Sequence, residues 1–154
     1  MPRLLQSIAA ASFLAAVACG LWYGLAGGSL PLALCVTFGA TAYHFIMRLF
    51  VGLVFSRIMK NRGDYRKGWY RIRPWEEGLY RRLRVKSWKG KLPSYDPNTF
   101  SPKLHTWEEI AGAMCQAELV HETIVLFSFL PVLAAVWLGE FWVFFLTSLF
   151  AAAF

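Results

Sequence analysis

Acidic side chains, histidine and paired cysteines are all scarce in this sequence of 154 residues. Its 9 Asp and Glu are outnumbered by 16 Lys and Arg, and it contains only 3 His. Cys19, Cys35 and Cys115 stand singly inside apolar runs, which excludes a disulfide framework or a zinc pattern and favours small packing residues. No serine lies in a G-x-S-x-G context and no cysteine in a nucleophile context, which disfavours a covalent acyl-enzyme.

Positive charge is almost absent from the apolar parts of the chain. Of the 16 Lys and Arg, only Arg3 and Arg48 lie outside residues 56–103. A single basic loop between hydrophobic segments is the positive-inside pattern, so we expect the N-terminus and this loop to be cytoplasmic. The same cations would also be attracted to anionic headgroups. The net charge of +7 could suggest nucleic acid, but its confinement to one loop favours the membrane, and no nucleic-acid partner is expected.

Long apolar runs dominate the rest, and 57% of the residues are hydrophobic, which is too many for an ordinary soluble domain. The pattern predicts an all-α integral membrane protein, a four-helix transmembrane bundle formed by one membrane domain over residues 1–154. A signal peptide that ends near Cys19 is a weaker alternative for the first run, which continues past that point. The expected spans are 4–26, 32–54, 114–138 and 141–154, and the cytoplasmic loop covers 56–105.

The last apolar run is short for a span. Its 14 residues would form about 21 Å of helix at about 1.5 Å per residue. A bilayer core is roughly 30 Å thick. We therefore expect that the fourth span continues past Phe154.

The basic loop carries many aromatic residues, which disordered segments lack. We therefore expect it to be ordered against the membrane surface. Within it, residues 74–85 predict a short helix that opens with a proline and two acids. Trp75, Leu79 and Leu83 form an apolar stripe and arginines occupy the remainder, which is the pattern of an interfacial amphipathic helix.

A second helix start is marked by the capping box at residues 106–109, Thr-Trp-Glu-Glu. The long helix that follows carries Glu118, His121 and Glu122 on one face, because residues three and four apart are neighbours there. Ionisable groups that enter an apolar, bilayer-length segment are costly and require a reason. Nothing interrupts this helix before Pro131, where a kink is tolerable inside a bundle.

The pair Glu118 and His121 suits general-base catalysis. A carboxylate one turn from an imidazole can orient it, and histidine is the usual base near neutral pH. Such a base could take the proton of a substrate hydroxyl during direct acyl transfer. One alternative is a structural role, in which both side chains only bond neighbouring helices. The other is a membrane metalloenzyme, because Glu-x-x-His is the helical unit of di-iron bundles, although it occurs once here.

Other polar residues are secondary candidates for the site. His44, near the middle of the second span, is a candidate for lining it, and Arg48 is expected to snorkel to the cytoplasmic headgroups. In the loop, cations beside an aromatic ring could hold the phosphates of an acyl donor, although topology alone also explains them. These loop candidates are Arg71, Arg73, Trp88, Lys89 and Lys91.

Three short motifs carry a family resemblance: Trp-Lys-x-Lys at 88–91, Ala-Glu-Leu-x-His at 117–121 and Leu-Pro-Val at 130–132. In this order, over roughly residues 70–140, the chain resembles the glycosyl-4,4'-diaponeurosporenoate acyltransferases. These small membrane enzymes place a fatty acyl chain on the sugar of a glycosylated carotenoid acid. Gln116 and Glu122 stand where the family tends to have a basic and an aromatic residue, so a different glycolipid-like acceptor stays open.

The resemblance implies an acyltransferase of a bacterial-type cell membrane that esterifies a hydroxyl of a lipid-soluble acceptor. Carried over by position, Glu118 and His121 would be the reactive pair, with Trp88, Lys89 and Lys91 at its cytoplasmic rim. Acyl-CoA or an acyl lipid would be the co-substrate, with no further cofactor and no metal, and membrane lipids would be the partners. The alternative from another class is a non-enzymatic lipid-binding or assembly protein. The oligomeric state stays open.

Overall fold

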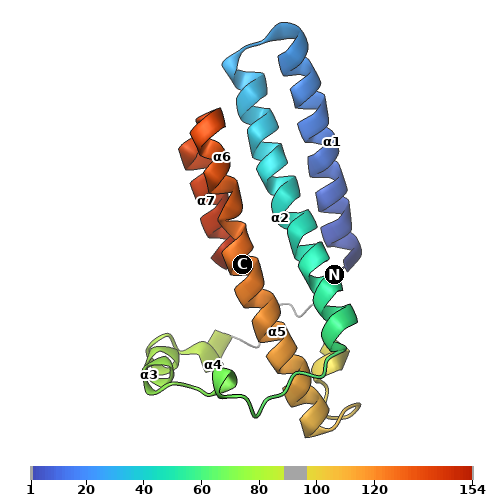
Figure 1. Ribbon diagram of the computed structural model, residues 1–154, viewed down its shortest axis with the longest axis vertical. Coiled ribbons are helices and arrows are strands. Elements are labelled where there is room, and N and C mark those ends of the chain that lie inside the picture. The colour runs from blue at the N-terminus through green and yellow to red at the C-terminus, as the bar shows by residue number, and fades with distance from the viewer. Residues whose placement is uncertain (1, 89–96, 154) are drawn as a thin grey trace. The chain divides into compact units, whose positions relative to one another are not determined.

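The computed structural model describes residues 2–88 and 97–153 of the chain (Figure 1). Every regular element in these ranges is helical and none is a strand, which confirms the all-α prediction. The elements are α1 (Pro2–Ala26), α2 (Ser29–Met59), η1 (Gly68–Tyr70), α3 (Pro74–Arg82), α4 (Val85–Trp88), η3 (Pro97–Phe100), α5 (Trp107–Ser128), α6 (Leu130–Leu138) and α7 (Phe141–Ala153).

The chain divides into two compact units. The first, here called the helical unit, comprises Met1–Lys60 and Glu118–Phe154. The second, the loop unit, comprises Asn61–Ala117. Helix α5 therefore begins in the loop unit and ends in the helical unit. One membrane domain over residues 1–154, and the cytoplasmic location of the loop, stay predictions.

Three helical segments are long and apolar enough to cross a membrane: Arg3–Ala26, Ser29–Met59 and Trp107–Leu138. They contain the first three predicted spans, and α2 runs on to Met59, beyond the expected end at residue 54. Helix α7 is apolar but shorter, with 13 residues. The four-span bundle and its orientation stay predictions.

The outer faces of the helical unit carry large apolar side chains that the protein does not cover. Leu25 of α1 is 91% exposed, and Trp137 of α6 is 80% exposed. Soluble monomers rarely leave such extensive apolar area exposed. The acyl chains of a bilayer would surround these apolar side chains without the cost of exposing them to water. This surface therefore supports the assignment of membrane spans.

Small residues allow α1 and α2 to pack along each other as an antiparallel pair (Figure 1). The Cys35 thiol donates a hydrogen bond to the carbonyl of Ala16, at 3.4 Å. A Cβ atom added at Gly20 would lie 3.4 Å from the Cys35 sulfur. Cys35 is therefore a packing residue at a close helix crossing, as the sequence predicted.

The third segment bends where the sequence predicted a kink. Helix α5 ends at Ser128 and α6 begins at Leu130, one residue before Pro131. Proline has no N–H, so the carbonyl of Phe127, four residues earlier, loses its helical donor. The Tyr43 hydroxyl of α2 donates to this carbonyl at 2.9 Å. A side chain of another helix thus satisfies the group that the bend exposes.

Most hydroxyls of the helical unit are satisfied within their own helix. Each donates to a carbonyl four residues earlier, at 2.7 to 2.8 Å. Such back-bonding is how Ser and Thr are accommodated where no water is available. The residues are Thr37, Thr41, Thr123, Ser128 and Thr147.

The loop unit is ordered by local contacts in its described part. The predicted capping box is present: the Glu109 carboxylate accepts from the Thr106 backbone N–H at 2.8 Å, and the Thr106 hydroxyl accepts from the Glu109 N–H at 3.3 Å. Two glycines allow the chain after α2 to lie directly on α5, where the Gly63 N–H donates to the carbonyl of Gly112 at 3.2 Å. Beside them, buried Gln116 accepts from the Asn61 N–H at 2.7 Å.

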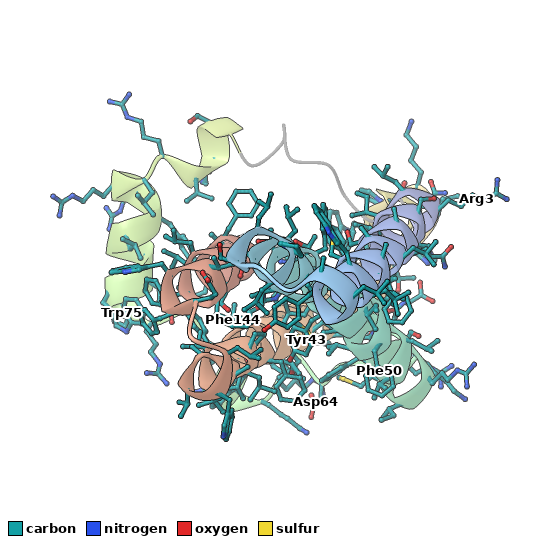
Figure 2. The ribbon with its side chains drawn as sticks, turned by 90° about the horizontal axis from the view of Figure 1, so that it is seen from above. Arg3, Tyr43, Phe50, Asp64, Trp75 and Phe144 are labelled. Atoms are coloured by element: carbon teal, nitrogen blue, oxygen red, sulfur yellow. The ribbon has the colours of Figure 1, made fainter. Side chains whose placement is uncertain are left out.

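The predicted amphipathic helix is present as α3, with its expected apolar stripe on the surface of the loop unit. Trp75, Leu79 and Leu83 are all exposed, and Figure 2 labels Trp75 on this helix. The helix ends earlier than predicted, because Arg84 adopts a left-handed φ of 49° and separates α3 from α4. Like charges one turn apart disfavour a continuous helix, and Arg81 and Arg84 have that spacing. Contact of this stripe with the membrane stays a prediction.

Candidate functional site

The candidate site begins on α2, where a histidine is buried among apolar residues. His44 is only 5% exposed. Neither of its ring nitrogens has a hydrogen-bond partner among residues 2–88 and 97–153. Its ring stands edge-on to that of Tyr43, with centroids 5.4 Å apart. Buried polar atoms are almost always paired, so an unpaired imidazole in this position needs an explanation.

Arg48 stands one turn further along α2, and its predicted snorkelling to the headgroups stays a prediction. Its side chain is half-buried, and its guanidinium donates to the backbone carbonyl of Ala151 in α7. A guanidinium turned toward another helix finds a hydrogen-bond acceptor, which compensates for its removal from water. Hydropathy did not reveal this acceptor, because it lies on a helix 103 residues away.

The charge of Arg48 also connects two predicted site residues. It acts electrostatically on the imidazoles of both His44 and His121. His121 lies on α5, in the part of that helix that belongs to the helical unit. The fold therefore brings the Arg48 guanidinium of α2 within electrostatic range of both His44 and His121, and we call these three residues the polar cluster.

Glu118, His121 and Glu122 occupy the predicted stripe on α5. All three side chains are exposed on the helical unit. Glu118 and His121 are one helical turn apart, so the spacing required for a carboxylate to orient the imidazole is present. The orienting role itself stays a prediction.

Helices α2 and α7 run in the same direction, and two contacts between them show which of their residues lie at the same level. Ala40 and Phe144 belong to one core cluster. Two turns further along, Arg48 contacts Ala151. Between these two levels stand His44 and Ser148, each four residues after Ala40 and Phe144. Ser148 is fully buried, and its hydroxyl, like the ring nitrogens of His44, has no partner among the described residues.

An apolar groove adjoins this level, at the bend of the third segment. It is open and has a volume of about 300 Å³. Figure 2 labels two of its lining residues, Tyr43 and Phe144, among the helices of this unit. We call it the Pro131 groove, and it is lined by Gly39, Ala40, Tyr43, Leu130, Pro131, Ala134 and Phe144.

The predicted donor-binding cations belong to the loop unit. Arg71 and Arg73 are exposed, between η1 and α3, and the Arg73 N–H donates to Glu76 at 3.1 Å in the first turn of α3. Trp88 is the last residue of α4. Its side chain, together with Lys89 and Lys91, lies outside the described residues. A common anion site formed by these five residues stays a prediction.

The metal alternative gains no ligand set in the described ranges. No group of three or more His, Cys, Asp and Glu side chains in them lies close enough to hold a metal ion. His105, another of the three histidines, pairs with Glu109 at 3.6 Å.

Sequence reasoning missed three contributors to this region: Ser148, Tyr43 and the groove. An isolated serine in an apolar helix carries no signal, since most such hydroxyls bond their own helix. Pro131 implies that the Phe127 carbonyl loses its helical donor. It does not indicate that the Tyr43 hydroxyl of another helix donates to that carbonyl. The groove depends on which helix faces meet, which periodicity alone does not specify.

A comparison of the sequence with models of known protein families finds a match. Residues 66–154 match the sequence profile of the glycosyl-4,4'-diaponeurosporenoate acyltransferases, which confirms the resemblance seen in the motifs. No curated protein and no solved structure matches the chain. The match covers more than half of the 154 residues and includes the polar stripe of α5, the Pro131 bend and all of α7. The chain belongs to the glycosyl-4,4'-diaponeurosporenoate acyltransferase family.

Proposed function

We propose that this protein is a membrane-embedded acyltransferase that esterifies a hydroxyl of a lipid-soluble acceptor with a fatty acyl chain. The acceptor is a glycosylated carotenoid or a similar glycolipid. Membership of the family supports the reaction class. The observation that carries the assignment is the polar cluster of His44, Arg48 and His121 on helices that are long and apolar enough to cross a membrane. Polar groups in a membrane segment are costly, and their usual reason is function.

In the proposed reaction His121 is the general base. It takes the proton of the acceptor hydroxyl as the hydroxyl oxygen attacks the acyl carbonyl carbon. A new ester bond forms, the bond between the acyl group and its carrier breaks, and His121 returns the proton to the departing carrier. Glu118, one turn away, orients the imidazole. Atoms and charge balance without a covalent enzyme intermediate, and no cofactor beyond the acyl donor is required.

The donor is acyl-CoA or an acyl lipid, and acyl-CoA and phospholipids both carry phosphate. Arg71 and Arg73, with Trp88, Lys89 and Lys91, would hold this anionic part at the cytoplasmic surface. Exposed arginines are suited to phosphate because their planar guanidinium groups can donate two parallel hydrogen bonds. The protein would lie in a bacterial-type cell membrane, with membrane lipids and its two substrates as partners.

Replacement of His121 by alanine tests the proposal. Because a general base contributes about 10²- to 10⁴-fold, His121→Ala should reduce acylation by at least that lower factor. The readout is lipid profiling of a host that expresses each variant, in search of one acylated species that depends on the protein. Membrane insertion, followed by extraction and proteolysis, should be unchanged.

His105→Ala is the matched control, because His105 pairs with Glu109 at the start of α5, in the loop unit. It should leave acylation intact. Full acylation with His121→Ala would refute the role of His121 as base. A host in which no acylated species depends on the protein would favour the non-enzymatic alternative.

A further inference from the structure

The Pro131 groove is an open apolar surface with room for part of a slim apolar ligand. Its volume of about 300 Å³ stands at the low end of the roughly 300–1,000 Å³ of ligand pockets. Gly39 and Ala40 leave the groove open on its α2 side, because neither has a large side chain. A Cβ atom added at Gly39 would meet nothing within 4 Å. A glycosylated carotenoid is bulky at its sugar end, whereas a saturated acyl chain is narrow along its whole length. The space therefore favours an acyl chain.

Two unpaired polar side chains lie one helical turn beyond two lining residues of the groove, although neither of them lines the groove itself. His44 is one turn beyond Ala40, and Ser148 is one turn beyond Phe144, in the same direction along two parallel helices. Both side chains are more than nine-tenths buried and lack partners among the described residues. The other fully buried hydroxyl of this unit, that of Ser128, donates to the carbonyl of Ile124 at 2.7 Å. His44 and Ser148 differ from it, because no described residue hydrogen-bonds their polar side-chain atoms.

We propose that the Pro131 groove binds the acyl chain of the donor, with the acyl carbonyl oxygen held by His44 and Ser148. An acyl chain has one polar group at one end, which matches an apolar groove with two unpaired polar side chains one helical turn beyond its lining residues Ala40 and Phe144. One imidazole N–H and the serine O–H both donate to the carbonyl oxygen, which pairs the Ser148 hydroxyl and one of the two ring nitrogens of His44. The identity of the ligand rests on the proposed function, whereas the groove and the unpaired groups do not.

Photolabelling of the full chain in lipid nanodiscs tests the groove. Two probes carry the same diazirine near the end of a palmitoyl chain: palmitoyl-CoA and phosphatidylglycerol. We expect one of them to label residues 130–134 and to be displaced by its unlabelled form, and the active probe identifies the donor class. Labelling of these residues by neither probe would overturn the proposal.

A glycine pair supplies matched variants for this experiment. Gly39 lines the groove and Gly52 does not, yet a Cβ atom at either position meets nothing within 4 Å. Gly39→Leu should fill the groove and reduce labelling of residues 130–134 by about tenfold or more, as expected where a side chain blocks an apolar pocket. Gly52→Leu should label like the unmodified protein. Equal labelling of both variants would contradict the proposal.

A serine pair tests the carbonyl contact. Ser148 and Ser128 are both fully buried, but only the Ser128 hydroxyl has a partner among the described residues. Ser148→Ala should weaken probe binding about three- to tenfold, the usual effect of one hydrogen bond. It should also raise the unfolding temperature of the ligand-free protein, because an unsatisfied buried hydroxyl is removed. Ser128→Ala should leave probe affinity unchanged, and equal affinities for the two variants would overturn the assignment of the carbonyl.

Failure of the groove and failure of the proposed function give different results. If His121→Ala leaves acylation intact while Gly39→Leu still abolishes labelling, the catalytic proposal fails and the acyl site stands. If His121→Ala abolishes acylation while the two glycine variants label equally, the catalytic proposal stands and the acyl site is refuted.

Discussion

At the scale of single residues, the polar groups of the helical unit fall into two classes. Most hydroxyls are bonded within their own helix, and the Phe127 carbonyl that Pro131 leaves free is satisfied by Tyr43. His44 and Ser148 form the second class, since the described residues offer them no partner. Residues of the first class stabilise the fold, and those of the second are the groups that we propose to bind the acyl carbonyl oxygen.

The Tyr43 contact yields a prediction on stability. Tyr43→Phe removes the donor to Phe127 and should cost about 0.6 kcal/mol, and up to about 1.7, the measured range for hydrogen bonds between membrane helices. In a Pro131→Ala background the alanine N–H can bond the Phe127 carbonyl, so the same substitution should cost less. Unfolding of the four proteins of this double-mutant cycle in detergent measures the difference. Equal costs in both backgrounds would refute the link between Tyr43 and the proline.

At the scale of elements, close backbone contact determines how the chain after α2 lies on α5. A Cβ atom at Gly63 would lie 2.6 Å from the Cys115 Cβ and 2.8 Å from the Gly112 oxygen. Neither neighbour is the flexible end of a side chain, so both resist displacement. These glycines are required by packing between segments about 50 residues apart rather than by a turn.

Replacement of Gly63 tests this contact. Gly63→Ala should destabilise the loop unit by about 1–3 kcal/mol, the cost of overpacking a tight site. Gly78→Ala is the control, since Gly78 lies in α3 with nothing within 4 Å of an added Cβ. It should instead stabilise α3 by about 1 kcal/mol through helix propensity. Hydrogen exchange of residues 107–116 reports the effect, and unchanged exchange in Gly63→Ala would show that the contact is not tight.

At the scale of the whole molecule, the distribution of charge predicts how the chain crosses the membrane. The basic loop should stay in the cytoplasm, and the uncharged turn between α1 and α2 should face outward. The two long N-terminal helices are compatible with this arrangement, because each is long enough to span the bilayer.

Cysteine labelling measures the orientation directly. In a chain whose three native cysteines are replaced by alanine, Ser29→Cys should react with an impermeant maleimide in intact cells. Lys103→Cys should react only after permeabilisation. Both positions are exposed in the structure, so a difference reflects the side of the membrane. The reverse pattern would overturn the predicted topology.

The sequence by itself determined the helical class, the three long apolar segments, the capping box at Thr106 and the bend at Pro131. Each depends on residues within a few positions of one another, where composition and helical spacing act directly. The motifs at 88–91, 117–121 and 130–132 together carried the family resemblance that the profile match confirms. Glu118 and His121 could be singled out because charge is expensive in an apolar run.

Only the tertiary structure decided which polar groups meet and which stay unpaired. That Arg48 reaches α7, that His44 and Ser148 share one level, and that a groove opens beside Pro131 all follow from the register between α2, α6 and α7. Register between helices about 100 residues apart is set by side-chain packing across their interface. Local sequence does not encode it, because an apolar helix presents similar side chains in every direction.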